Sequence, residues 1–355
     1  MVDWLAGNRV RGTSTERTTS AGFNDGFTGT GGWKELARTT LGSAGDDIDV
    51  TGLADKRYLM VLIDEQSSGE TYGRMRFNAD TGNNYATRYS SNGGSDSTLT
   101  SFGSCVNYPP PVSNQVAFSV NYITNKSDKE KLVITPDSVG SNTSGAGNAP
   151  QRRECVSKWT NTSSVISQVN IENGTSGDFT SGSECVVLGW DDSDTHTTNF
   201  WEELADVTLG SSATTLSTGT FTAKKYLWFQ TYMKSGNCDY RLTFNGDSGS
   251  NYATRWSENG GSDVTSTSTA FNYLSPQGAS TPRFTNTFMI NNSANEKLGI
   301  SHVALQNTAG AGTAPERDEV VHKWANTSAQ ITSLTVAASI NTLSAGTQIK
   351  VWGSD

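Results

Sequence analysis

FNADTGNNYATRYSSNGGSD, residues 77–96, returns later in the chain as FNGDSGSNYATRWSENGGSD, residues 244–263, with 15 of 20 positions identical. Each copy contains Asn-x-Asp-x-Gly, in which the Asp side chain accepts a hydrogen bond from the backbone ahead of it and the Gly favours a turn. Strand-like segments flank the motif, YGRMRF before it and NYATRYS after it in the first copy. The pattern predicts a β-hairpin that occurs twice in the chain.

The repeat extends over most of the 355 residues. Three further blocks recur in the same order, and they are 33–37 with 201–205, 145–166 with 310–331, and 181–189 with 345–353. The spacing between copies drifts only from 168 to 164 residues, so the two halves are expected to share one fold almost loop for loop. The polar segment 191–198 separates them. We therefore predict an N-terminal arm (1–30), a first domain (31–192) and a second domain (193–355).

Short strands dominate the expected secondary structure. The chain is rich in Gly, Ser, Thr, Asn and Asp, and its helix-forming residues never form long amphipathic runs. About eight segments of the second half are typical of strands, at 226–233, 240–244, 251–256, 284–290, 297–305, around Lys323 and Trp324, 331–338 and 348–353. Such spacing is typical of sandwiches and jelly rolls. The predicted fold is all-β, with two tandem duplicated β-sandwich (jelly-roll-like) domains and an extended N-terminal arm.

The arm, residues 1–30, lies outside the repeat. It is polar and contains Arg9, Arg11 and Arg17. A segment of this composition cannot bury a core of its own. We expect it either to be disordered or to dock onto a partner.

Composition narrows the classes of function. The net charge of −9 argues against nucleic-acid binding. No apolar run reaches the roughly 18 residues of a membrane span, and the N-terminus lacks the apolar stretch of a signal peptide. We therefore expect the protein to be made and assembled in a cytoplasm, without nucleic acid or membrane as a partner.

The four cysteines have no counterparts in the opposite half and form no CxxC motif; they are Cys105, Cys155, Cys185 and Cys238. A disulfide framework or zinc site would normally be duplicated with the fold. We expect buried free thiols, with a disulfide between Cys155 and Cys185 as the alternative.

Asp80-Thr81-Gly82 and Asp247-Ser248-Gly249 have the form of the aspartic-protease triplet, in which two facing carboxylates share a proton and activate water. In that family the triplet follows an apolar strand, whereas here it follows Phe-Asn-Ala and Phe-Asn-Gly. The triplet is also part of a longer repeated unit that the protease motif does not explain. We therefore favour a turn, and we retain an aspartic-protease-like enzyme using Asp80 and Asp247 as the third alternative.

The same turn resembles two other chemical motifs. Gly246-Asp247-Ser248-Gly249-Ser250 is close to the nucleophile sequence of trypsin-like proteases, but nothing singles out a base among His196, His302 and His322. The alternating Asn and Asp side chains also suggest a Ca²⁺ loop, but each loop carries one carboxylate and no closing bidentate Glu. We assign no catalytic, cofactor-binding or metal-binding residue, and no cofactor.

Charged and aromatic residues recur as well. The repeated charges are Arg88 and Arg255, Asp96 and Asp263, Arg152 and Arg317, and Glu154 and Glu319. We expect them to form ion pairs within each domain that brace loops. Trp33, Trp159, Trp201 and Trp324 are expected to be core or edge aromatics.

Both halves then end with Trp-x-Asn-Thr-Ser (159–163 and 324–328), an Ile-containing strand, a turn of small residues and a strand that closes in Gly. This order resembles the C-terminal strands of jelly-roll modules in structural proteins of tailed phages and related viruses. The hairpin at 77–96 is similar to one found in such modules, and residues 3–14 resemble the start of structural proteins from viruses of marine type. The resemblance covers nearly the whole chain and implies no catalytic residues.

The resemblance implies a virion structural protein, in the role of capsid decoration, vertex spike, or tail or fibre component. Its expected partners are other virion proteins, reached through the arm, and further copies of itself. A host-surface glycan is a further candidate partner. The alternative function is a carbohydrate-binding or adhesin module, since jelly rolls often serve as lectins.

Overall fold

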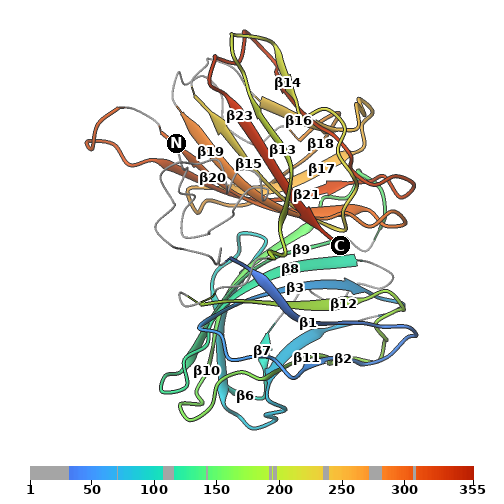
Figure 1. The fold of residues 1–355 in the computed structure, drawn as a ribbon, viewed down its shortest axis with the longest axis vertical. Helices are drawn as coiled ribbons and strands as arrows, with labels where there is room; N and C mark the ends of the chain where they lie inside the picture. The colour runs from blue at the N-terminus through green and yellow to red at the C-terminus, as the bar shows by residue number, and fades with distance from the viewer. Residues whose placement is uncertain are drawn as a thin grey trace.

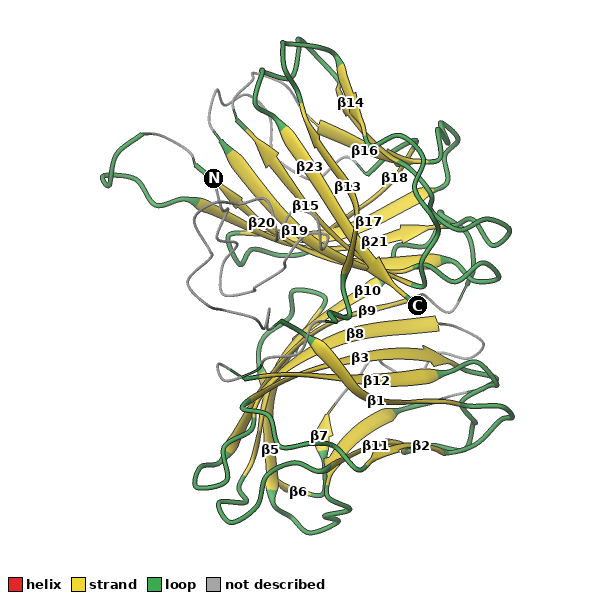
Figure 2. Cartoon of the chain, in the orientation of Figure 1, coloured by secondary structure: helices red, strands yellow, loops and turns green. Residues whose placement is uncertain are grey.

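The computed structural model describes residues 32–69, 71–106, 116–140, 143–191, 194, 198–234, 240–271, 282–306 and 309–355. Within these ranges the regular structure is β-strand (Figure 2). None of the described segments forms a helix that is long and apolar enough to cross a membrane. The predicted arm, residues 1–30, lies outside the described residues, as do His196 and Cys238.

The first half forms a sandwich of two antiparallel sheets. Its large sheet has the strand order β1-β12-β3-β8-β9-β10-β5-β6, and its small sheet has the order β2-β11-β4-β7. The strands are β1 (Lys34–Thr40), β2 (Asp47–Thr51), β3 (Tyr58–Gln66), β4 (Gly73–Phe77), β5 (Tyr85–Ser91), β6 (Ser97–Phe102), β7 (Cys105–Val106), β8 (Val116–Thr124), β9 (Lys131–Val139), β10 (Gln151–Trp159), β11 (Gln168–Asn173) and β12 (Glu184–Trp190).

The second half repeats this arrangement. Its sheets have the orders β13-β23-β15-β19-β20-β21-β17-β18 and β14-β22-β16. The strands are β13 (Glu202–Thr208), β14 (Thr215–Ser217), β15 (Tyr226–Met233), β16 (Tyr240–Phe244), β17 (Tyr252–Glu258), β18 (Val264–Ser268), β19 (Arg283–Ile290), β20 (Lys297–Leu305), β21 (Glu316–Trp324), β22 (Leu334–Ala338) and β23 (Gln348–Ser354).

The two halves also share irregularities of their strands. β1 has a bulge between Glu35 and Ala37, and β13 has the same bulge between Glu203 and Ala205. The place of β7 is taken in the second sandwich by an isolated bridge between Leu242 and Phe271. The predicted fold class, all-β with tandem duplicated sandwiches, is confirmed. No described sheet mixes strands of the two halves.

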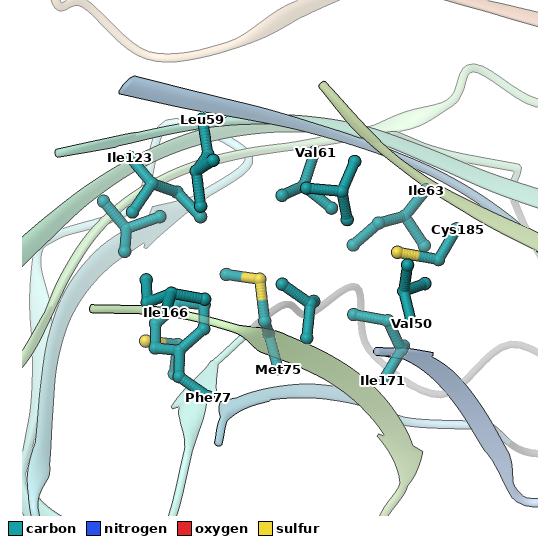
Figure 3. Close-up of a cluster of buried hydrophobic side chains, with 14 of the residues drawn as sticks. Val50, Leu59, Val61, Ile63, Met75, Phe77, Ile123, Ile166, Ile171 and Cys185 are labelled. Carbon is teal, nitrogen blue, oxygen red and sulfur yellow. The ribbon is translucent and has the colours of Figure 1, made fainter. Parts of the chain in front are cut away.

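Each sandwich has its own apolar core between its two sheets. Figure 3 shows part of the first, where Leu59, Val61 and Ile63 of β3 lie opposite Met75 and Ile171 of the small sheet. These β3 residues alternate with Met60 and Leu62, which point to the other face of the same sheet. Both faces of β3 are therefore buried, which explains its nearly uninterrupted apolar sequence.

A third apolar cluster lies between the two sandwiches. It combines Met60, Leu62, Phe118, Val120, Val186 and Leu188 of the first with Phe200, Trp201, Tyr226, Trp228, Phe288, Ile290, Leu298, Ile300 and Trp352 of the second, together with Trp33. The outer faces of the two large sheets meet in this contact (Figure 1). Its aromatic centre includes Trp228, which stacks on Phe288 at 5.3 Å between ring centroids. Burial of this much aromatic surface stabilises one fixed arrangement of the sandwiches.

Polar contacts add to this interface. Lys225 Nζ of the second sandwich lies 3.2 Å from Asp64 Oδ2 and 3.0 Å from Glu184 Oε1 of the first. The Tyr226 hydroxyl donates to Glu184 over 2.8 Å. Because Asp64 and Glu184 are buried, the lysine supplies the charge partner that ionised carboxylates need away from water.

Candidate functional site

The Asp80 and Asp247 turns form, but the predicted β-hairpin around each of them is wrong. β4 and β16 lie in the small sheets, whereas β5 and β17 lie in the large ones, so each turn crosses from one sheet of its sandwich to the other. The reason is that both strands bury apolar side chains, such as Phe77 and Tyr85, in the core between the two sheets.

Asn78 and Ala79 adopt positive φ angles of 53° and 54°, and Asn245 and Gly246 adopt 52° and 68°. The Asp80 carboxylate accepts a hydrogen bond from the backbone N–H of Gly82 at 2.9 Å. This is the local Asp-to-backbone bond that the sequence predicts for such a turn.

Each aspartate also ties its turn to a buried tryptophan. Trp159 Nε1 donates to Asp80 Oδ2 over 2.7 Å, and Trp324 Nε1 donates to Asp247 Oδ2 over the same distance. The Asn84 amide donates to both oxygens of Asp80. The carboxylates therefore join the β4–β5 and β16–β17 turns to β10 and β21, the strands that carry the tryptophans.

This bonding also bears on the protease alternative. Burial raises the pKa of Asp80, but the hydrogen bonds from Trp159, Asn84 and Gly82 outweigh it and hold the pKa below its usual value. Asp247 has the same balance in its own turn. A shared-proton pair requires one carboxyl with a raised pKa. Here each aspartate is bonded as an ionised acceptor within its own sandwich.

The metal-site and trypsin-like alternatives also lack an assembled site among the described residues. Among the described residues, no group of three or more His, Cys, Asp or Glu side chains is placed to hold a metal ion. His322 Nε2 lies 2.9 Å from the hydroxyl of Ser301, not of Ser248, and burial lowers the pKa of His322 to about 3. Cys105, Cys155 and Cys185 are buried free thiols, so the Cys155–Cys185 disulfide is absent. The four repeated tryptophans are buried, as predicted.

The repeated charges differ from the prediction. Arg88 pairs with Asp96 at 3.4 Å on the surface of the first sandwich, as expected. Arg152, however, reaches across to the second sandwich, where its guanidinium lies 2.7 Å from Asp263 and 3.0 Å from Glu319. The prediction of purely intradomain pairs is therefore wrong for Arg152. The reason is the packing of the sandwiches, which places the β17–β18 turn beside β10.

An apolar groove lies on the outer face of the first large sheet. It encloses about 800 Å³ over β3, β8, β9, β10, β5 and β6. Six of its side chains, which we call the open face, are Tyr58, Tyr122, Leu132, Ile134, Val156 and Trp190. At its edge Tyr58 stacks on Trp190, with 5.5 Å between ring centroids and 22° between planes. Its lining is mostly apolar, which is typical of binding surfaces.

At four of the six open-face positions the second sandwich carries the same residue type, as Tyr226, Leu298, Ile300 and Val321, and there these side chains are buried. Leu132 is 55% exposed and its equivalent Leu298 is 0% exposed. The corresponding values are 56% and 3% for Ile134 and Ile300, and 50% and 1% for Val156 and Val321. Leu298 and Ile300 belong to the cluster between the sandwiches. One copy of this apolar surface is thus used inside the chain and the other faces solvent.

Sequence reasoning missed the open face. The signal was present in Leu132-Val133-Ile134, where apolar residues occupy both faces of a strand. Val133 points into the core, and its two neighbours point outward. Such a run is typical of a strand covered on both sides.

Known proteins show only distant similarity to this chain. No protein-family model matches the chain, and no curated protein matches it. Among solved structures, the chain is similar to domains LG4-5 of the mouse laminin alpha1 chain, with 10% identity, 90% of this chain and 89% of that chain covered, and a TM-score of 0.21. The LG1-3 region of the laminin alpha2 chain gives 8% identity, 91% and 63% coverage, and a TM-score of 0.20.

Proposed function

We propose that the chain is a structural protein of a virion, acting in assembly, stabilisation or host attachment without catalysis. Capsid decoration, a vertex spike, and a tail or fibre component are the roles that fit this proposal. The setting is supported by the resemblance of the repeated motifs to jelly-roll structural proteins of tailed phages. The protein would be incorporated into particles assembled in the host cytoplasm.

The open face carries the assembly part of this proposal. Leu132, Ile134 and Val156 are each at least half exposed, although the same residue types are buried at the equivalent positions of the other half. An apolar surface of this kind lowers its free energy when a protein partner covers it. A structural protein that is built into a larger assembly supplies such a partner.

Binding of a host-surface glycan is the second candidate. The stacked pair of Tyr58 and Trp190 at the edge of the groove favours it, because aromatic faces pack against sugar rings. The groove floor offers mainly aliphatic side chains, whereas a sugar needs converging polar groups. The aromatic edge alone supports this candidate, so we rank it below assembly.

Mass spectrometry and immunogold electron microscopy test the virion role. Mass spectrometry of purified virus particles is expected to detect the protein. After labelling with antibody against the full chain, gold is expected on the capsid or tail. Protein that is abundant in the infected cells but absent from purified particles contradicts the proposal.

The absence of catalysis is tested separately. Unfolded casein incubated with the full chain at acid pH is expected to remain intact, with or without the substitution Asp80→Asn. Cleavage by the natural chain that is lost in Asp80→Asn would restore the protease alternative.

A further inference from the structure

We infer that the open face binds the open face of a second copy of this chain, so that two chains pair about a two-fold axis. The inference rests on the assembly role proposed above and names the partner in that role. Three observations support it. The equivalent residues of the second sandwich are buried, the open face is continuous with an existing interface, and most exposed large apolar side chains lie on this face.

The chain already contains one contact in which a sandwich of this fold covers the same residues. Leu298 and Ile300 are buried where the large sheet of the first sandwich meets that of the second, and Val321 of the neighbouring strand is buried as well. Their equivalents on the first sandwich have the same types and the same places on β9 and β10. A large sheet of this fold is therefore suited to cover them.

The open face also continues the surface of the existing contact. Tyr122 belongs to the groove and packs on the cluster between the sandwiches, where its ring meets Phe288 edge-on at 6.5 Å. Trp190, which also lines the groove, packs against the same cluster. The apolar surface is thus continuous from the buried contact into solvent.

The surface of the partner follows from what each copy leaves exposed. The residues of the first sandwich that share a cluster with Leu298 and Ile300, such as Met60 and Phe118, are already buried within every chain. Of the large apolar side chains that are exposed in the described residues, four belong to the open face, namely Tyr58, Leu132, Ile134 and Val156. The other three lie on separate elements, at Tyr232, Val264 and Ile340. The best apolar match for an open face in a second copy is therefore another open face.

The polar rim fits a self-complementary contact. Arg88 with Asp96, and Lys158 with Glu130, form exposed ion pairs beside the groove, at 3.4 Å and 2.9 Å. A rim that carries both signs of charge can be paired with its own copy after a two-fold rotation. Such a contact is isologous, so it closes at two chains and does not grow into a filament.

Analytical ultracentrifugation of the full chain tests the inference. The natural chain is expected to sediment as a dimer at micromolar concentration, and Ile134→Asp is expected to weaken dimerisation by about 30-fold or more, as for a central interface residue. Ile340→Asp is the matched control, because Ile340 is 49% exposed but lies outside the groove. Its dimer is expected to be unchanged, and circular dichroism checks that both variants remain folded.

A photo-crosslinking amino acid at position 134 identifies what covers the face. In a mixture of ¹⁴N- and ¹⁵N-labelled chains, crosslinks that join peptides of the two labels and lie within the open face are expected. Monomeric natural chain, a dimer insensitive to Ile134→Asp, or crosslinks only to residues 1–31 of the same chain would overturn the inference. Detection of the protein in virions together with any of these results leaves the proposed function standing. If the protein dimerises through the open face but is absent from virions, the inference stands and the proposed virion function fails.

Discussion

The carboxylate of Asp80 accepts hydrogen bonds from a backbone N–H, an asparagine amide and a tryptophan indole, and the repeat preserves all of these donors around Asp247. The residue that most resembles a catalytic group is therefore the centre of a brace, at the turn that connects the two sheets of the sandwich. Its Asp, Asn and Trp lie in two separate sequence blocks that recur together. Their recurrence as a set is explained by folding, since the bond to tryptophan joins the two blocks.

Asp80→Asn is expected to destabilise the protein by about 1–3 kcal/mol, because the indole of Trp159 loses a charged acceptor. Asp247→Asn should have an effect of similar size, since its contacts are the same. Urea denaturation followed by tryptophan fluorescence measures both. Asp128→Asn, on an exposed loop, is the control and should leave the midpoint unchanged. Equal midpoints for the natural chain and Asp80→Asn would contradict the brace.

At the scale of strands, the sequence predicted the elements with strong apolar patterns. The segments 226–233, 240–244 and 297–305 coincide with β15, β16 and β20. The strands that were missed in the second half are β13, β14 and β18, which lie at the edges of their sheets. β14 and β18 have the sequences TLS and VTSTS. Edge strands of this kind bury little apolar surface, so their sequences look like loops.

The difference between β9 and β20 could not be predicted from the residues. Leu132 and Leu298 follow a lysine at the start of equivalent strands, and both point outward. Only the packing of one sandwich on the other decides which leucine is buried. Packing of this kind depends on residues far apart in the chain, whereas patterns in the sequence report mainly on local structure.

Leu298→Asp is expected to lower the free energy of unfolding by about 3–5 kcal/mol, because it places a charge in the cluster between the sandwiches. Leu132→Asp makes the same chemical change on an exposed side chain, and its effect should stay within about 0.5 kcal/mol. Chemical denaturation at low protein concentration compares the two. Similar losses in both variants would show that the two leucines do not differ in burial.

At the scale of the whole molecule, the two halves have the same fold but contact each other through non-equivalent surfaces. Arg152 is buried between Asp263 and Glu319, whereas its equivalent Arg317 is exposed and pairs with Glu319. Gly93 belongs to the same region, and a Cβ atom on it would lie 2.7 Å from the backbone nitrogen of Asp263. The close approach of the two backbones fixes how the sandwiches sit.

Gly93→Ala and Gly260→Ala test this approach as a matched pair. Both glycines have positive φ, 71° and 74°, so both substitutions carry backbone strain of about 1 kcal/mol. Only Gly93→Ala also collides with the backbone of the other sandwich; at Gly260 the nearest atom is the flexible end of Arg317. Calorimetry should therefore show a larger loss of stability in Gly93→Ala. If Gly93→Ala loses no more stability than Gly260→Ala, the close approach of Gly93 to Asp263 does not contribute to stability.

The same contact makes stability depend on pH. Glu154 faces Arg152 on its own strand, and Glu319, Arg317 and His302 on the second sandwich. Burial and the charge of Glu319 raise the pKa of Glu154 to about 7, although Arg152 lowers it in part. Because this pKa lies above that of the unfolded chain, the folded state binds more protons between the two values. The contribution of Glu154 is therefore lost as pH rises through about 7.

Denaturation of the natural chain and Glu154→Gln between pH 5 and pH 8 isolates this contribution. The stability of the natural chain relative to the variant is expected to fall as pH rises. Glu65 and Asp318, whose pKa values are raised to about 8 and about 7, act in the same direction in both proteins, and His302, whose pKa burial lowers, acts in the opposite one. A difference that is constant across this range contradicts the assignment to Glu154.

The connection from Trp190 at the end of β12 to Glu202 at the start of β13 is short, and it has a thermodynamic consequence. A short tether gives the second sandwich an effective concentration on the order of millimolar near the first. The contact between the two sandwiches therefore forms at any protein concentration, whereas the open face is not tethered to its partner. Its occupancy is set by the abundance of its partner, so that crowding at a site of synthesis favours association and release into a dilute medium favours separation.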